Sequence, residues 1–172
     1  MSEVVFKLKV SIEPDGDEVT KSTDDVTPTD LSGVVIKSND EQRYVLMVAY
    51  PSLKKDTAVA QDGFIDFGTA PVIEKACFNF MRKGCKLGMF HEAGHENCGE
   101  VVENYIYRGP TWITKSDDGT QQIIENGDWL VGMILQPEIW QMYKAGLIGG
   151  ASPQGKAKRR IPDAATLAQL RL

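Results

Sequence analysis

The sequence predicts a strand-rich α+β fold, with helices flanking a mostly antiparallel sheet or partly closed barrel. Three observations support this fold class. Short apolar runs rich in β-branched residues recur along the chain, which is typical of strands. One segment, around residues 72–80, instead carries apolar residues at helical spacing, and a short second segment is bounded by Pro137 and Gly146. The turn sequence Asp117-Asp118-Gly119 lies between two further runs and indicates a hairpin.

The expected strands share an apolar, β-branched composition. They cover residues 4–12, 33–38, 43–51, 85–90, 99–109 and 128–136, while 147–152 fits either a strand or a turn. Residues 13–30 hold seven acidic side chains against one lysine, so we expect an acidic loop or insert there.

Both expected helices have recognisable ends. In the first, Thr69 can cap the amino end, Pro71 lies in the first turn and Gly84 follows the last turn. The second is short; it opens at Pro137 and is closed by Gly146. We therefore expect one helix on each side of the sheet.

Composition limits the class of protein. A chain of 172 residues suits one domain, and its apolar runs are too short to span a bilayer. Three cysteines without a C-x-x-C pair favour a reducing, intracellular setting. A net charge of -5 argues against a nucleic-acid partner, and no cofactor motif is present. We expect Cys77, Trp129 and Trp140 to lie in the core.

The stretch "HEAGH" matches the zinc-protease pattern H-E-x-x-H and contains the chain's two histidines, His91 and His95. Such a site needs a helix, so that both imidazoles reach one metal. Gly88 and Gly94 make a helix doubtful, and Cys98 stands where the extended motif has glycine. Three interpretations remain: a zinc site, a polar loop, and a loop with one catalytic histidine.

A second candidate site surrounds Ser152, which follows an apolar run in a glycine-rich turn. Glycines beside a serine let a substrate approach and leave backbone amides available for an oxyanion. The same composition is also common in plain surface turns. A serine nucleophile would need His91 or His95 as its base.

Six stretches of the chain, taken in order, resemble a known family. They are "VIEKACFNFM", "LGMFH", "GEVVENYI", "GDWLVGMIL", "EIWQMYKAGLIGGAS" and "GKAKR". Together they resemble the XkdF-type phage serine proteases, a branch of the tailed-phage prohead proteases, over about residues 60–160. The resemblance implies an assemblin-like fold, a strand-rich barrel flanked by helices.

The resemblance also implies residue roles. His91 matches the general base, Ser152 the nucleophile and Glu103 the glutamate of the middle strand, our candidate for the third catalytic residue. Gly150, Ala151 and Arg159 are the residues it suggests for oxyanion or substrate binding. No metal or cofactor is implied.

The implied function is cleavage of phage scaffold and major capsid proteins, and of the protease itself, inside the procapsid in the host cytoplasm. We expect a homo-oligomer without nucleic-acid or membrane partners. Residues 1–160 would form one protease domain, and 161–172 a C-terminal tail where the family often continues into another strand. A truncated chain and a self-processed chain both fit that ending.

One departure from the family pattern keeps two alternatives open. Pro153 follows the serine where the family usually has a small aliphatic residue, and it removes one amide from an oxyanion hole. The alternatives are a zinc-binding protein using His91 and His95, and a non-catalytic capsid-assembly or scaffold protein that retains the fold.

Overall fold

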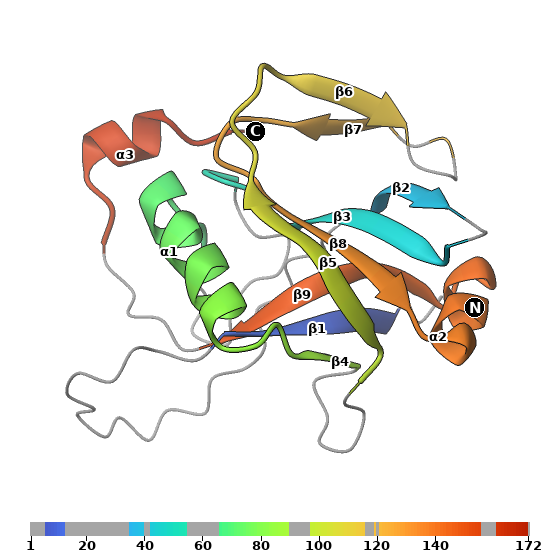
Figure 1. Ribbon diagram of the computed structural model, residues 1–172. Coiled ribbons are helices and arrows are strands. Elements are labelled where there is room, and N and C mark those ends of the chain that lie inside the picture. Colours follow the sequence, from blue (N-terminus) through green and yellow to red (C-terminus); the bar gives the residue numbers. More distant parts are fainter. Residues whose placement is uncertain are drawn as a thin grey trace.

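The computed structural model describes residues 6–12, 35–39, 42–54, 66–89, 97–115, 119, 121–155 and 161–171 (Figure 1). The elements in chain order are β1 (Phe6–Ile12), β2 (Val35–Asn39), β3 (Tyr44–Tyr50), α1 (Ala70–Arg82), β4 (Leu87–Met89), β5 (Gly99–Ile106), β6 (Trp112–Lys115), β7 (Gln121–Ile124), β8 (Trp129–Leu135), α2 (Pro137–Lys144), β9 (Ile148–Gly155) and α3 (Ala164–Ala168).

The described strands form three sheets. A four-stranded sheet has the order β2-β3-β8-β5, and all its neighbouring pairs are antiparallel. A three-stranded sheet has the order β4-β1-β9, with β1 antiparallel to β4 and parallel to β9. Strands β6 and β7 pair as a separate hairpin. The predicted α+β, mostly antiparallel class is confirmed, and the described strands form no closed barrel.

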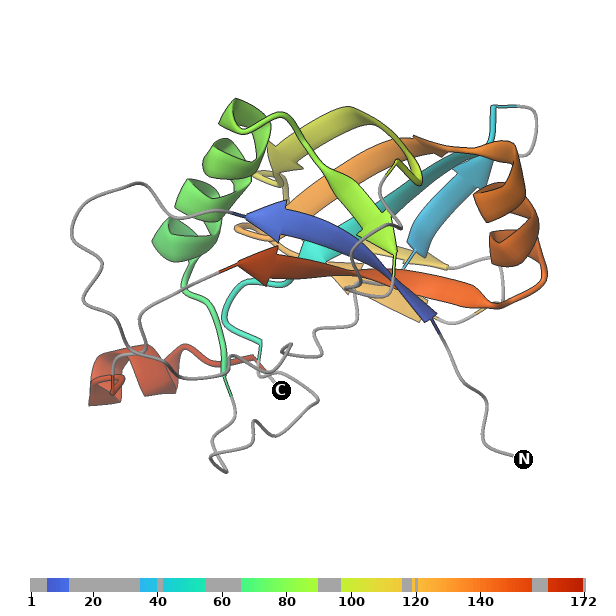
Figure 2. The same cartoon turned by 90° about the horizontal axis from the view of Figure 1, so that it is seen from below.

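The two predicted helices are present as α1 and α2, at opposite ends of the two larger sheets (Figures 1 and 2). Gly84 and Gly146 follow them with φ of 87° and 72°, a backbone conformation that glycine adopts without steric cost. Thr69 occupies the N-cap position of α1, but its side chain makes no capping hydrogen bond. Its carbonyl accepts the first helical N–H groups instead.

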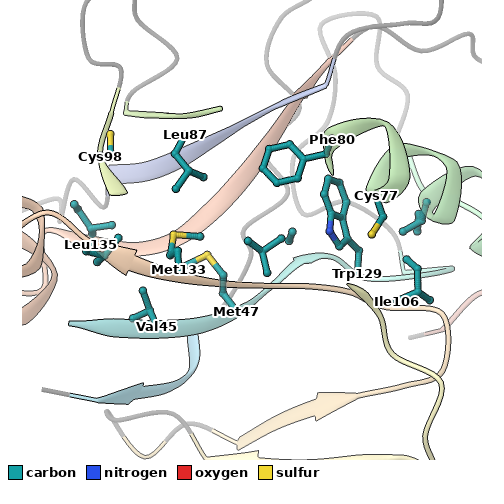
Figure 3. Close-up of a cluster of buried hydrophobic side chains, with 14 of the residues drawn as sticks. Val45, Met47, Cys77, Phe80, Leu87, Cys98, Ile106, Trp129, Met133 and Leu135 are labelled. Atoms are coloured by element: carbon teal, nitrogen blue, oxygen red, sulfur yellow. The ribbon is translucent and has the colours of Figure 1, made fainter. Parts of the chain in front are cut away.

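The main core lies between the two larger sheets and under α1 (Figure 3). Phe80 of α1 meets Trp129 of β8 edge to face, with ring centroids 5.6 Å apart. Leu87 of β4 enters the same cluster from the three-stranded sheet. Cys77, Trp129 and Trp140 are all buried in this cluster, as the sequence predicts.

A second, smaller core lies on the other face of the four-stranded sheet, beneath the β6–β7 hairpin. It contains Ile36, Leu46, Ile124 and Leu130. Because side chains alternate along a strand, Leu46 and Leu130 face this cluster while their neighbours face the main core. The four-stranded sheet is thus covered on both faces.

The C-terminal segment, predicted as a tail, contains the short helix α3 and returns to the body of the protein. The Arg171 guanidinium pairs with Asp128 and Glu125 and donates to the Ser52 carbonyl. Asp128 is 1% exposed, so its carboxylate is withdrawn from solvent. The acidic segment 13–30 lies outside the described residues, and so do residues 156–160, which carry four basic side chains.

Candidate active site

Ser152 lies within strand β9, so the strand alternative for residues 147–152 is confirmed and the glycine-rich turn predicted around Ser152 is corrected. The turn comes earlier, at Gly146, between α2 and the strand. The pairing of β9 with β1 is irregular near its start: Phe6 pairs with Ile148, whereas Lys7 pairs with Gly150. One extra residue of β9 is therefore accommodated at Gly149, where glycine tolerates the local bend.

The strand register relates Ser152 to the predicted base. Met89 at the end of β4 and Ala151 of β9 both pair with Leu8, and Ser152 pairs with Lys9. Neighbouring strands are about 4.8 Å apart, so the β4 end and β9 are separated by about 10 Å. His91 follows Met89 by two positions in the chain. It lies outside the described residues, so the pairing of His91 with Ser152 stays a prediction.

The residues predicted to line an oxyanion site lie next to Ser152. Gly150 and Ala151 pair with Lys7 and Leu8 of β1. Among the described strands, none pairs with the other edge of β9. Backbone amides of β9 that point away from β1 are thus not used by a strand ladder. Arg159 lies in the stretch that the structure does not describe.

Pro153 has a structural explanation in this arrangement. Proline cannot donate to a strand ladder and is tolerated mainly at sheet edges. Strand β9 is such an edge in the three-stranded sheet, and Pro153 pairs with Val10 there. The proline therefore fits its strand.

Glu103 lies elsewhere. It pairs with Gly132 of β8, and its Oε2 accepts a hydrogen bond from the Tyr44 hydroxyl at 3.0 Å. Gly132 alternates with Val131 and Met133, which face the main core, so Glu103 is on the opposite face, beside the second core. The β4-β1-β9 sheet packs on the main-core side. This position gives no support to Glu103 as a partner of His91.

The zinc motif, residues 91–95, lies outside the described residues, and the zinc interpretation stays open. Cys98, which follows this motif and could join a zinc site with the two histidines, is 4% exposed, and burial raises the pKa of its thiol. A raised pKa disfavours the thiolate that a metal requires. Within the described residues, no three His, Cys, Asp or Glu side chains gather closely enough to hold a metal ion.

Two groups of neighbouring polar side chains were not predicted from the sequence. One is the contact of Arg171 with Asp128 and Glu125; the other is an open cleft that includes Tyr44 and Glu103. Both join residues far apart in the chain, so no local motif marks them. The sequence signal for the first was a lone arginine in a nearly uncharged C-terminal segment.

Comparisons with known proteins agree with the predicted resemblance. Residues 32–160 match the model of the family described as "Putative phage serine protease XkdF". The chain is 32% identical over 120 residues to the phage-like element PBSX protein XkdF of Bacillus subtilis strain 168, covering 69% of this chain and 38% of that protein.

A second relative comes from the same organism. The chain is 30% identical over 125 residues to the uncharacterized protein YqbD, covering 73% of this chain and 35% of that protein. The matched part is thus well under half the length of either relative. No solved structure matches. None of the described helices is both long and apolar enough to span a membrane.

Proposed function

This chain belongs to the family described as "Putative phage serine protease XkdF", and on that basis we propose that it is a serine endopeptidase of prohead maturation. Its substrates would be phage scaffold and major capsid proteins, and the protease itself. It would act as a homo-oligomer inside the procapsid, in the host cytoplasm. The assemblin-like fold implied by the resemblance is part of this proposal.

One observation carries the proposal. The register joins β4, which precedes His91, and β9, which contains Ser152, in one three-stranded sheet. A catalytic serine and its base must come within hydrogen-bond reach, about 2.6–3.2 Å. Two residues of extended chain reach about 7 Å, so His91 starts from a strand end that makes such an approach feasible.

The proposed reaction has two halves. His91 takes the proton from Ser152 Oγ as that oxygen bonds to the carbonyl carbon of the substrate peptide. The C–N bond then breaks, and the proton passes from His91 to the leaving amine. Water hydrolyses the acyl-enzyme with His91 again as base, which restores the Ser152 hydroxyl. Backbone amides at Gly150 and Ala151, with Arg159, would stabilise the oxyanion.

A third catalytic residue is left unassigned in this proposal, since Glu103 faces the second core. In serine proteases an acid holds the imidazole in the correct tautomer. An acid outside the described residues, or beyond Leu172, could supply this role.

A fluorophosphonate probe tests the proposed nucleophile. It reacts with activated serines, so we expect mass spectrometry to find the label on Ser152. Loss of the general base in His91→Ala should slow labelling by about 100-fold or more. Ser38→Ala changes a strand serine in the other large sheet and should label normally. Normal labelling of Ser152→Ala would refute the assignment.

Processing tests the substrate class. Co-expression with the scaffold and major capsid proteins of the same phage should yield cleaved products with the parent chain and none with Ser152→Ala. Stoichiometric zinc that disappears in His95→Ala would favour the metalloprotein instead. Absence of both labelling and processing would favour the non-catalytic assembly protein.

A further inference from the structure

An open cleft lies on the second-core face of the four-stranded sheet, at the side of the β6–β7 hairpin. Its volume is about 430 Å³, within the range of about 300–1,000 Å³ usual for ligand sites. The lining residues come from β2, β3, the turn between them, β5 and β6. They are Asn39, Gln42, Tyr44, Leu46, Glu103 and Trp112.

Glu103 carries the one charge among these six lining residues. Its Oε2 accepts a hydrogen bond from the Tyr44 hydroxyl at 3.0 Å. Burial first, and then the hydrogen bond with Glu103, raise the pKa of Tyr44. The phenol therefore remains a neutral donor, and its hydrogen bond orients the Glu103 carboxylate.

Gly132 makes room for this pair. A Cβ at position 132 would lie 2.9 Å from the Glu103 Cβ and 2.9 Å from the Tyr44 hydroxyl oxygen. Real Cβ atoms essentially never approach so closely. The carboxylate and the phenol therefore lie directly over a strand position that has no side chain, which fixes their place in the cleft.

Aromatic and amide groups complete the cleft. Trp112 is half-buried and packs on Tyr107 with ring centroids 6.3 Å apart, which holds the indole in place. Asn39 and Gln42 are exposed, and the Asn39 amide donates to the Gln42 Oε1. An indole face attracts cations, a carboxylate binds them, and amide oxygens accept their N–H groups.

From this combination we infer that the cleft binds an arginine side chain of a protein partner. A guanidinium can stack on an indole while its N–H groups reach a carboxylate, whereas an ammonium acts as a point charge. One exposed carboxylate gives weak binding, so the arginine would belong to a longer polypeptide that makes further contacts. The inference is independent of proteolysis, because the cleft and the Ser152 sheet lie on opposite sides of the four-stranded sheet.

The test uses the whole chain and Nα-acetyl-arginine-N-methylamide, with signals followed by NMR. We expect the Trp112 indole N–H and the Gln42 and Glu103 amides to shift together, with a dissociation constant in the millimolar range. The matching citrulline derivative has a similar shape without the charge and should not bind. Equal binding of the two compounds, or shifts confined to other regions, would overturn the inference.

Single substitutions measure how much each lining residue contributes to binding of the arginine derivative. Glu103→Gln should weaken binding by up to about fivefold, and Trp112→Leu by about threefold. Gly132→Ala should also weaken it by displacing the carboxylate. Glu138→Gln removes a similar exposed charge from α2 and serves as the matched control. A folded Glu103→Gln protein that keeps full affinity would contradict the inference.

The readout is binding alone, so an inactive Ser152→Ala protein should give the same values.

Discussion

Polar groups in the main core are hydrogen-bonded to one another, and burial there raises the pKa of the Cys77 thiol. The Trp129 indole donates to Asn104 at 2.7 Å, and Asn104 donates to the Cys77 carbonyl at 3.1 Å. Burial raises the pKa of the Cys77 thiol to about 11, although the contact with Asn104 opposes the shift. The unfolded thiol loses its proton at lower pH, so the free energy of unfolding should fall as pH rises from about 9 toward 11.

Urea unfolding of the parent chain and Cys77→Ala at several pH values checks this. Between pH 9 and 11 the free energy of unfolding should fall more for the parent than for Cys77→Ala. The cavity left by the substitution lowers the variant's stability by the same amount at every pH, so it does not affect this comparison. Burial also raises the pKa of Cys85 and Cys98, so the quantity to compare is the difference between the two proteins. Parallel curves would show that the Cys77 thiol does not titrate differently on folding.

Helix α1 packs on the core through one face, and its buried and exposed phenylalanines can be compared as a pair of variants. Phe80 is 0% exposed and touches Trp129, whereas Phe78 is 50% exposed. Phe80→Ala should lower the free energy of unfolding by about 3–5 kcal/mol, because it removes buried surface and leaves a cavity. Phe78→Ala should cost under about 1 kcal/mol. Similar urea midpoints for the two variants would contradict this packing of the helix.

Across the whole molecule, Arg171 joins the C-terminal segment to the end of β3 and to the turn before β8. Asp128 also accepts the amides of Ser52 at 2.8 Å and Glu125 at 2.9 Å, so three chain segments meet on one buried carboxylate. Arg171→Ala leaves that charge without its guanidinium, which should cost about 3 kcal/mol. Thermal or urea unfolding would measure the loss.

The exposed pair of Arg108 and Glu74 is the control. Arg108→Ala should change the free energy of unfolding by less than about 1 kcal/mol, because solvent screens a surface ion pair. Limited proteolysis adds a second measurement: Arg171→Ala should expose α3 to cleavage before the sheets are attacked. Equal stability of the two arginine variants would mean that the C-terminal contact contributes little.

Local patterns in the chain were sufficient to predict most elements. Apolar runs marked the strands, and helical spacing with Pro71 and Gly84 marked α1, because side-chain period and backbone chemistry are properties of the local sequence. The segment around Ser152 fitted either a strand or a turn, since glycine and proline usually indicate a turn. It forms β9, an edge strand, where both residues are tolerated. The lone arginine in the C-terminal segment was the only local sign of the Arg171 contact, and it did not show which residues Arg171 meets.

The order of motifs along the chain also identified the family, which the comparisons confirm. Tertiary structure alone decided which distant residues meet. Pairing through Leu8 joins the strand before His91 to the strand of Ser152, and alternation along β5 turns Glu103 toward Tyr44 instead. Strand register and sheet packing depend on contacts between segments far apart in sequence, so no single motif contains them.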